Sequence, residues 1–228
     1  MSDAPHIVSD VMTLPVLPVL AVGRDARFKE IVRAMEQRQV SAVPVVEGEG
    51  RVVGVVSEAD LLPKEEFREC GPTRHDRIRR RSVLAKAEAL TAEELMSTPA
   101  VTVGPDVTLA QAARIMAKEH VKRLPVVDDE GRLCGIVSRG DLLKVFLRSD
   151  ADIEEEVRRT VVSYLFPTVS HAIHVSVRDG VVTLRGRVHD TSLIWVAERL
   201  VRALEGVVGV ESRLSGEDAA PSGPETTQ

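Results

Sequence analysis

The sequence predicts a mixed α/β protein of the α+β kind, with one unit present twice as a pseudo-two-fold pair and a small αββαβ domain after it. The first observation is a repeat: Pro44-Val45-Val46 recurs as Pro125-Val126-Val127, and Asp60-Leu61-Leu62 recurs as Asp141-Leu142-Leu143, each 81 residues later. The second is a change after Ser149 to short runs that alternate apolar and polar residues. Two small units that cannot bury their apolar faces alone indicate a packed pair with a cleft between the copies.

Each copy is expected to read helix, strand, strand, helix. In the second copy, Thr108 and Gln111 form a capping-box pair that opens the first helix. Strands are predicted over residues 124–127 and 133–137, and Ser138 opens a short helix. The first helix of the first copy has an apolar stripe with i, i+3, i+4, i+7 spacing, formed by Phe28, Ile31, Val32 and Met35. This order predicts a sheet covered by helices on one face.

The register of the repeat changes upstream and between the copies. Met12 matches Met96, 84 residues later, which places three extra residues in the first copy, within residues 14–20. Residues 67–90 read as a polar, arginine-rich linker and a helix, and the helical stretch runs from near Ser82 to Met96. The basic cluster of this linker consists of Arg74, Arg77, Arg79, Arg80 and Arg81. It is interpreted as a solvated linker or, alternatively, as a loop that contacts an anion. Nucleic acid is not the expected partner, because a chain with 3% aromatic residues lacks interleaved stacking side chains.

The segment after Ser149 predicts a separate small domain. Its first helix has an apolar ridge of Ile153, Val157, Val161 and Leu165. Two alternating strands follow, joined by a two-residue turn at Asp179-Gly180. Asp190 or Thr191 caps a second helix, Gly206 ends it, and residues 207–214 supply a third strand. The element order is therefore αββαβ.

Composition and targeting signals indicate a cytoplasmic protein. The net charge of −5 gives no general attraction to nucleic acid or anionic membrane. Cys70 and Cys134 lie in unlike settings, which favours a reducing compartment over a disulfide framework. The N-terminus lacks a basic region, and Pro15 and Pro18 interrupt the apolar run of residues 14–22, so neither export nor a membrane span is expected.

Catalytic and metal-binding patterns are not found in the sequence. The six histidines do not form a pair at metal-ligand spacing with a carboxylate, and His171 and His174 read as exposed strand residues rather than as a metal pair. There is no Gly-x-Ser-x-Gly elbow, phosphate-binding Gly-Lys-Ser/Thr loop or Gly-x-Gly-x-x-Gly turn. The chain is therefore expected not to be an enzyme.

The repeated motifs resemble a tandem pair of CBS domains, also called a Bateman module. The residues that carry the resemblance are Val43-Pro44-Val45-Val46, Gly54-Val55-Val56-Ser57 and Asp60-Leu61-Leu62, with their counterparts at 124–128, 135–138 and 141–143. Residues 173–188 and 206–210 resemble a BON domain. The expected organisation is CBS domain 1 at residues 1–66, the linker at 67–90, CBS domain 2 at 91–149, the BON domain at 150–215 and a disordered tail at 216–228.

Ser57-x-x-Asp60 and Ser138-x-x-Asp141 are the expected ligand-binding motifs. The resemblance implies that the serine holds a phosphate and that the carboxylate accepts both hydroxyls of a ribose. The same pattern also fits an ordinary helix cap, and the two roles are compatible.

Charge favours the second of the two expected sites. Arg139 follows Ser138, and Lys122 and Arg123 precede Leu124-Pro125, so cations are expected to converge on a phosphate there. The adenine is expected to lie against aliphatic strand residues. The remaining site residues are Val43, Pro44, Leu124 and Pro125.

These observations predict a non-catalytic regulatory protein. Its CBS pair is expected to bind AMP, ADP, ATP, an S-adenosyl-type compound or an NAD-type compound as a regulatory ligand rather than as a firm cofactor. The ligand state would pass to the BON domain or to a protein partner, and a homodimer is expected. The alternatives are an interaction adaptor without ligand and a protein that acts at a phospholipid surface through the BON domain.

Overall fold

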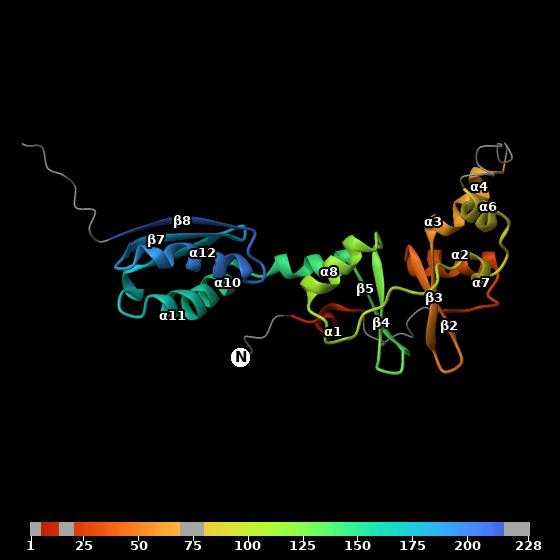
Figure 1. The fold of residues 1–228 in the computed structure, drawn as a ribbon, viewed down its shortest axis with the longest axis horizontal. Helices are drawn as coiled ribbons and strands as arrows, with labels where there is room; N and C mark the ends of the chain where they lie inside the picture. The colour runs from red at the N-terminus through yellow and green to blue at the C-terminus, as the bar shows by residue number, and fades with distance from the viewer. Residues whose placement is uncertain (1–5, 14–20, 69–79, 217–228) are drawn as a thin grey trace, which may run out of the picture. The chain divides into compact units, whose positions relative to one another are not determined.

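The computed structural model describes residues 6–13, 21–68 and 80–216 (Figure 1). The chain divides into two units, Met1–Leu142 with both repeats and Leu143–Gln228 with the C-terminal domain. Several sequence-based expectations concern positions outside the described residues: the three extra residues within 14–20, Cys70, most of the basic cluster (Arg74, Arg77 and Arg79) and the tail from residue 217. No helix within the described ranges combines the length and the apolar character needed to cross a bilayer.

Both repeats have the predicted order of elements. The first repeat comprises β1 (Val22–Gly23), α2 (Phe28–Arg38), β2 (Ala42–Glu47), β3 (Arg51–Ser57) and α3 (Glu58–Leu61). The second comprises α8 (Leu109–Lys118), β4 (Arg123–Val127), β5 (Leu133–Ser138) and α9 (Arg139–Leu143). In the first, β1 pairs parallel with β2 and β2 pairs antiparallel with β3; β4 and β5 form the matching antiparallel pair.

The apolar stripes of the helices face the sheets, except for Val32 of the predicted stripe, which is 38% exposed. In α2, Ile31 and Met35 are buried, and they pack with Val43 and Val45 of β2. Helix α8 buries the corresponding positions, Leu109, Ala112 and Met116. Thr108 caps α8, because its Oγ1 accepts a hydrogen bond of 3.3 Å from the Gln111 N–H. The predicted capping-box pair is therefore confirmed.

The segment before each repeat packs on the other repeat. Short helix α1 (Val8–Val11) docks on the second repeat, where the Val8 N–H donates to the Val107 carbonyl at 2.8 Å. Helix α7 (Ala92–Leu95) docks on the first, where the Ala92 N–H donates to the Ala26 carbonyl at 2.9 Å. The two repeats are thus joined by an exchange of their N-terminal segments.

The turns of the two hairpins also meet, at equivalent positions of the repeat. The Val52 N–H donates to the Gly131 carbonyl and the Leu133 N–H donates to the Gly50 carbonyl, both at 3.0 Å. These bonds flank an antiparallel bridge between Arg51 and Arg132, which are 81 residues apart. A two-fold relationship between the hairpins follows from this pairing.

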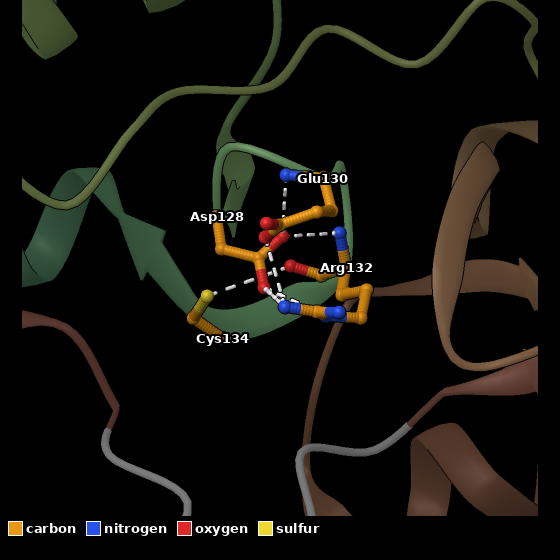
Figure 2. A network of polar contacts seen from close by, with 4 residues as sticks. All are labelled: Asp128, Glu130, Arg132 and Cys134. Carbon is orange, nitrogen blue, oxygen red and sulfur yellow. Dashed lines mark hydrogen bonds and ion pairs between the residues drawn. The ribbon is translucent and has the colours of Figure 1, made fainter.

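A carboxylate organises the turn between β4 and β5 (Figure 2). Asp128 accepts hydrogen bonds from the backbone N–H groups of Arg132 at 2.8 Å and Glu130 at 3.0 Å, and from Arg132 Nε at 2.8 Å. These bonds, the one from the Arg132 backbone first, lower the pKa of Asp128. Cys134 lies beside the network and donates to the Arg132 carbonyl at 3.4 Å, and burial raises the pKa of its thiol. The network is a structural brace of the turn.

The helical stretch predicted from Ser82 to Met96 is wrong as one element. It forms α6 (Arg81–Glu88) and, after a break, α7. The break is tertiary in origin, since the Leu90 carbonyl accepts the Phe28 N–H at 3.0 Å and Thr91 bridges Arg27. Glu94 closes the start of α7 by accepting the Leu90 N–H at 2.6 Å, a bond that lowers the pKa of its carboxyl.

Helix α6 packs beside α4 (Pro63–Glu66) through polar contacts. Lys64 Nζ donates to the Ala87 carbonyl at 2.9 Å and lies 5.2 Å from the centre of the Phe28 ring. Arg80, one of the two described members of the basic cluster, donates to Glu66 Oε2 at 3.1 Å. Arg81 begins α6 and is exposed.

The C-terminal unit has the predicted αββαβ order. Helix α10 (Asp150–Glu156) continues through a π-helical turn (Val157–Val162) into α11 (Ser163–Leu165), followed by β6 (His174–Arg178) and β7 (Val181–Val188). Then come α12 (Ile194–Ala203) and β8 (Gly209–Gly216). Figure 1 shows the helices on one face of the sheet, whose order is β6-β7-β8 with β7 and β8 parallel. Three short 3-10 turns complete the unit: Lys144–Leu147, Ser170–Ala172 and Thr191–Leu193.

The first residue of α10 closes the β6–β7 hairpin. Asp179 and Gly180 both have positive φ, 50° and 73°, as a type I′ turn requires. The Asp150 carboxylate accepts both of their backbone N–H groups at 2.9 Å. Just before α10, Arg148 pairs with Glu156 at 2.7 Å and donates to the Glu205 carbonyl at 2.9 Å. The start of the domain is therefore fixed to its hairpin and to the end of α12.

Candidate functional site

The first Ser-x-x-Asp motif sits where β3 ends and α3 begins. Asp60 turns back on Ser57: its Oδ2 accepts the Ser57 N–H at 2.7 Å and the Ser57 hydroxyl at 2.6 Å. Asp60 is only 8% exposed, although it is charged. Burial of a carboxylate is costly without partners, and these bonds provide two of them.

The second motif has the same geometry. Asp141 Oδ2 accepts the Ser138 N–H at 2.9 Å and the Ser138 hydroxyl at 2.6 Å, and the Asp141 N–H donates to Ser138 Oγ at 3.3 Å. Both motifs therefore form helix caps, as the alternative interpretation predicted. A cap of this kind also holds the aspartate in a fixed orientation.

A cavity of about 220 Å³ opens at the first motif and is lined by both repeats. The first repeat contributes residues 57–60 and the start of β2, and the second contributes residues 120–123 and the segment 97–101. His120, two residues after the end of α8, is in the left-handed region with φ of 55°, and this turn carries Lys122 and Arg123 to the cavity. The cavity therefore combines a carboxylate from one repeat with cations from the other.

Two of the predicted cations also reach the first motif. Arg123 pairs with Ser138 across β4 and β5, as expected. Lys122 and Arg123 in addition line the cavity of Ser57, where Arg123 Nε donates to Ser41 Oγ at 3.1 Å. The Arg139 guanidinium donates to the Val121 carbonyl at 3.1 Å, and its N–H donates to the Lys122 carbonyl at 3.1 Å. Arg139 therefore holds the turn that presents Lys122 and Arg123.

The aliphatic residues expected to contact a base do not line this cavity. Val43 and Leu124 are fully buried, and Pro44 and Pro125 are buried beside them. The apolar wall is formed by Ala42, Val55, Val101 and Val121. Alternation along β2 could have indicated this, because Ala42 and Val43 project from opposite faces of the strand.

Lys86 is a site residue that the sequence did not reveal. Its Nζ forms an ion pair with Asp60 Oδ1 and lies 3.4 Å from Ser97 Oγ. The side chains of Lys86 and Asp60 are 22% and 11% exposed. Because Lys86 belongs to α6, outside the repeat, no periodicity or motif connects it with Asp60.

The charges at the cavity suit an anionic ligand with hydroxyl groups. Lys122 and Arg123 are available to a phosphate, and the Asp60 carboxylate is an acceptor for hydroxyls. The described residues contain no group of three or more histidine, cysteine or acidic side chains able to hold a metal ion. His174 is exposed on β6, and the side chain of His171 is outside what the structure describes.

Comparison with known proteins assigns both units. The CBS domain family matches residues 8–64 and 92–148, which together make up half of the chain. The BON domain family matches residues 149–217.

Relatives and solved structures agree with the CBS assignment. The uncharacterized protein MJ1426 of Methanocaldococcus jannaschii is 31% identical over 161 residues, covering 62% of this chain and 91% of that protein. The inosine-5'-monophosphate dehydrogenase of the same organism is 29% identical over 126 residues, covering 55% of this chain but only 21% of the enzyme. The chloroplastic CBS domain-containing protein CBSX2 of Arabidopsis thaliana is 26% identical over 160 residues, covering 65% of this chain and 67% of that protein.

The CBSX2 fold has also been determined in a complex with AMP. That structure superposes with a TM-score of 0.55 at 26% identity, over 62% of this chain and 97% of the other. The repeat, the paired sheets and the family matches lead to one assignment. The chain belongs to the CBS domain family, with two CBS domains followed by a C-terminal BON domain.

Proposed function

We propose that this chain is a non-catalytic regulatory protein whose CBS pair binds an adenine nucleotide or a related adenosine compound. The observation that carries the proposal is the cavity where Asp60 of the first repeat faces Lys122 and Arg123 of the second. The carboxylate accepts ribose hydroxyls, and the cations bind the phosphate. The AMP complex of CBSX2 supports this choice of ligand class.

The size of the cavity indicates how such a ligand sits. A volume of about 220 Å³ is below the range of about 300–1,000 Å³ typical of sites for drug-sized ligands. We therefore expect the ribose and phosphate to fill the cavity and the base to extend along the Val101 and Val121 wall. The contacts of the base with Val101 and Val121 do not require an aromatic side chain.

A nucleotide panel tests this function. AMP, ADP, ATP and S-adenosylmethionine are added in turn to the full chain, and the unfolding temperature is measured. A ligand present at 100 times its Kd stabilises the folded state by about 2.7 kcal/mol, so the binder raises the midpoint. The Asp60→Asn variant is expected to lose most of the shift. Absence of a shift with every compound would favour the adaptor that works without ligand.

We further propose that ligand state passes to the BON domain. The CBS family match extends to residue 148, yet residues from Leu143 onward belong to the C-terminal unit. The end of the second CBS domain is thus held by the Arg148 contacts with Glu156 and Glu205. Hydrogen exchange over residues 150–215, measured with and without AMP, tests the coupling. Changes confined to residues 8–149 would contradict it, because coupling requires different affinities for two states.

A homodimer and a lipid surface remain proposals with their own tests. CBS pairs commonly associate into dimers, and sedimentation of the full chain decides whether this one does.

The lipid alternative has one supporting observation: Trp195, the single tryptophan of the sequence, is 61% exposed on α12. Exposed tryptophan suits a membrane interface. Co-sedimentation with phosphatidylserine vesicles, lost in Trp195→Ala, would support that role.

A further inference from the structure

The two oxygens of the Asp60 carboxylate have different partners. Oδ2 accepts two hydrogen bonds from Ser57, and Oδ1 is paired with Lys86. A carboxylate offers roughly four acceptor positions, and the described residues occupy three of them. About one position is left, whereas the two hydroxyls of a ribose need two. While the Ser57 cap keeps Oδ2, a ribose that binds Asp60 through both hydroxyls therefore competes with Lys86 for Oδ1.

We propose that Lys86 is a built-in competitor for the ribose at Asp60, and that occupation of the first site releases helix α6. This inference rests on the proposed nucleotide function of the same cavity. It gives the linker between the CBS domains a role, because α6 lies at residues 81–88, between the two family matches. Ligand binding at the first site then becomes a change in the linker.

The packing of α6 is consistent with release. None of its eight residues, all of which are described, is fully buried. Its described polar contacts with the first repeat are the Lys86 pair with Asp60 and the Lys64 bond to the Ala87 carbonyl, with the Arg80 pair with Glu66 just before the helix. Its apolar residues Val83, Leu84 and Ala87 are only half-buried. A helix without a fully buried side chain has low local stability, so the partly buried Lys86 ion pair contributes to its attachment.

The test compares Lys86→Met with Lys64→Met in the full chain. Methionine keeps the length of the side chain without its charge, and Lys64→Met removes another contact of α6 without touching Asp60. Calorimetric titration with AMP and with adenosine is expected to show about three- to tenfold tighter binding to Lys86→Met, the equivalent of about one net hydrogen bond. Lys64→Met is expected to bind like wild type. Adenosine should gain as AMP does, because the competition concerns ribose hydroxyls rather than phosphate.

A second measurement on the unchanged protein covers the case in which Lys86→Met folds poorly. AMP is expected to protect residues 55–60 of wild type from hydrogen exchange and to increase exchange in residues 81–88. Protection at 55–60 without increased exchange in α6, together with unchanged or weaker binding by Lys86→Met, would overturn the inference and leave the nucleotide function intact. No binding of AMP or adenosine by any of the three proteins would overturn the proposed function and this inference with it.

Discussion

Met96 lies so close to Gly54 that a Cβ atom on the glycine would come within 2.8 Å of the Met96 Cγ. The same relationship exists in the other half of the pair, where a Cβ on Gly135 would come within 2.7 Å of the Met12 Sδ. In each case a methionine from the start of one repeat covers a strand glycine of the other. These two glycines therefore have no side chain because the exchanged segments occupy that space.

Gly54→Ala is expected to lower the free energy of unfolding of the CBS pair by about 1–3 kcal/mol, the usual cost of overpacking. Gly104→Ala is the matched control, because nothing lies within 4 Å of a Cβ at that position. Urea unfolding followed by circular dichroism measures both. Equal effects of the two substitutions would show that the Met96 contact is unimportant.

Arg123→Gln is expected to weaken AMP binding by about tenfold or more, since a hydrogen bond to a charged group contributes about 1.5–3 kcal/mol. Adenosine, which lacks the phosphate, should bind Arg123→Gln nearly as well as wild type. Arg33→Gln, on the exposed face of α2, controls for the loss of one positive charge. Equal weakening of AMP and adenosine in calorimetry would mean that Arg123 acts by holding Ser41 instead.

Asp150→Ala is expected to destabilise the BON domain by about 1.5–3 kcal/mol, because it removes a charged acceptor from the N–H groups of Asp179 and Gly180. Trp195 is the single tryptophan and belongs to this domain, so its fluorescence during urea unfolding reports on it. Glu155→Ala, an exposed substitution in the same helix, is the control. A midpoint that moves equally in both variants would contradict the role of Asp150.

The contribution of Asp128 to stability is expected to depend on pH. Its pKa in the folded state is lowered, so the unfolded chain takes up the proton first as the pH falls. The stabilisation is complete above the unfolded pKa of about 3.9 and is lost as the pH falls through the lower folded value. Wild type and Asp128→Asn should therefore differ in stability at pH 7, and the difference should disappear as the pH falls through the folded pKa of Asp128. Asp129→Asn, at the neighbouring exposed position, controls for the loss of one negative charge, and a pH-independent difference would contradict the prediction.

Local patterns were sufficient for most of the fold. The short motifs of each repeat, the Thr108 and Gln111 cap and the Asp179-Gly180 turn are each formed by residues close together in the sequence. The structure contains each of them. The helical stretch from Ser82 to Met96 was the exception, because Phe28 of the first repeat bonds to Leu90 and breaks it. A hydrogen bond between residues 62 positions apart leaves no local signal.

The sequence by itself determined the two CBS repeats, the BON domain and the two Ser-x-x-Asp caps, since hydrophobic period, turn residues and caps act over a few residues. Only the tertiary structure decided which groups share a cavity. Pseudo-two-fold packing carries Lys122 and Arg123 to the motif of the other repeat, and the linker helix places Lys86 on Asp60. The physical reason is that a site is assembled by contacts between distant segments, and their partners are fixed by the packing of whole repeats rather than by spacing along the chain.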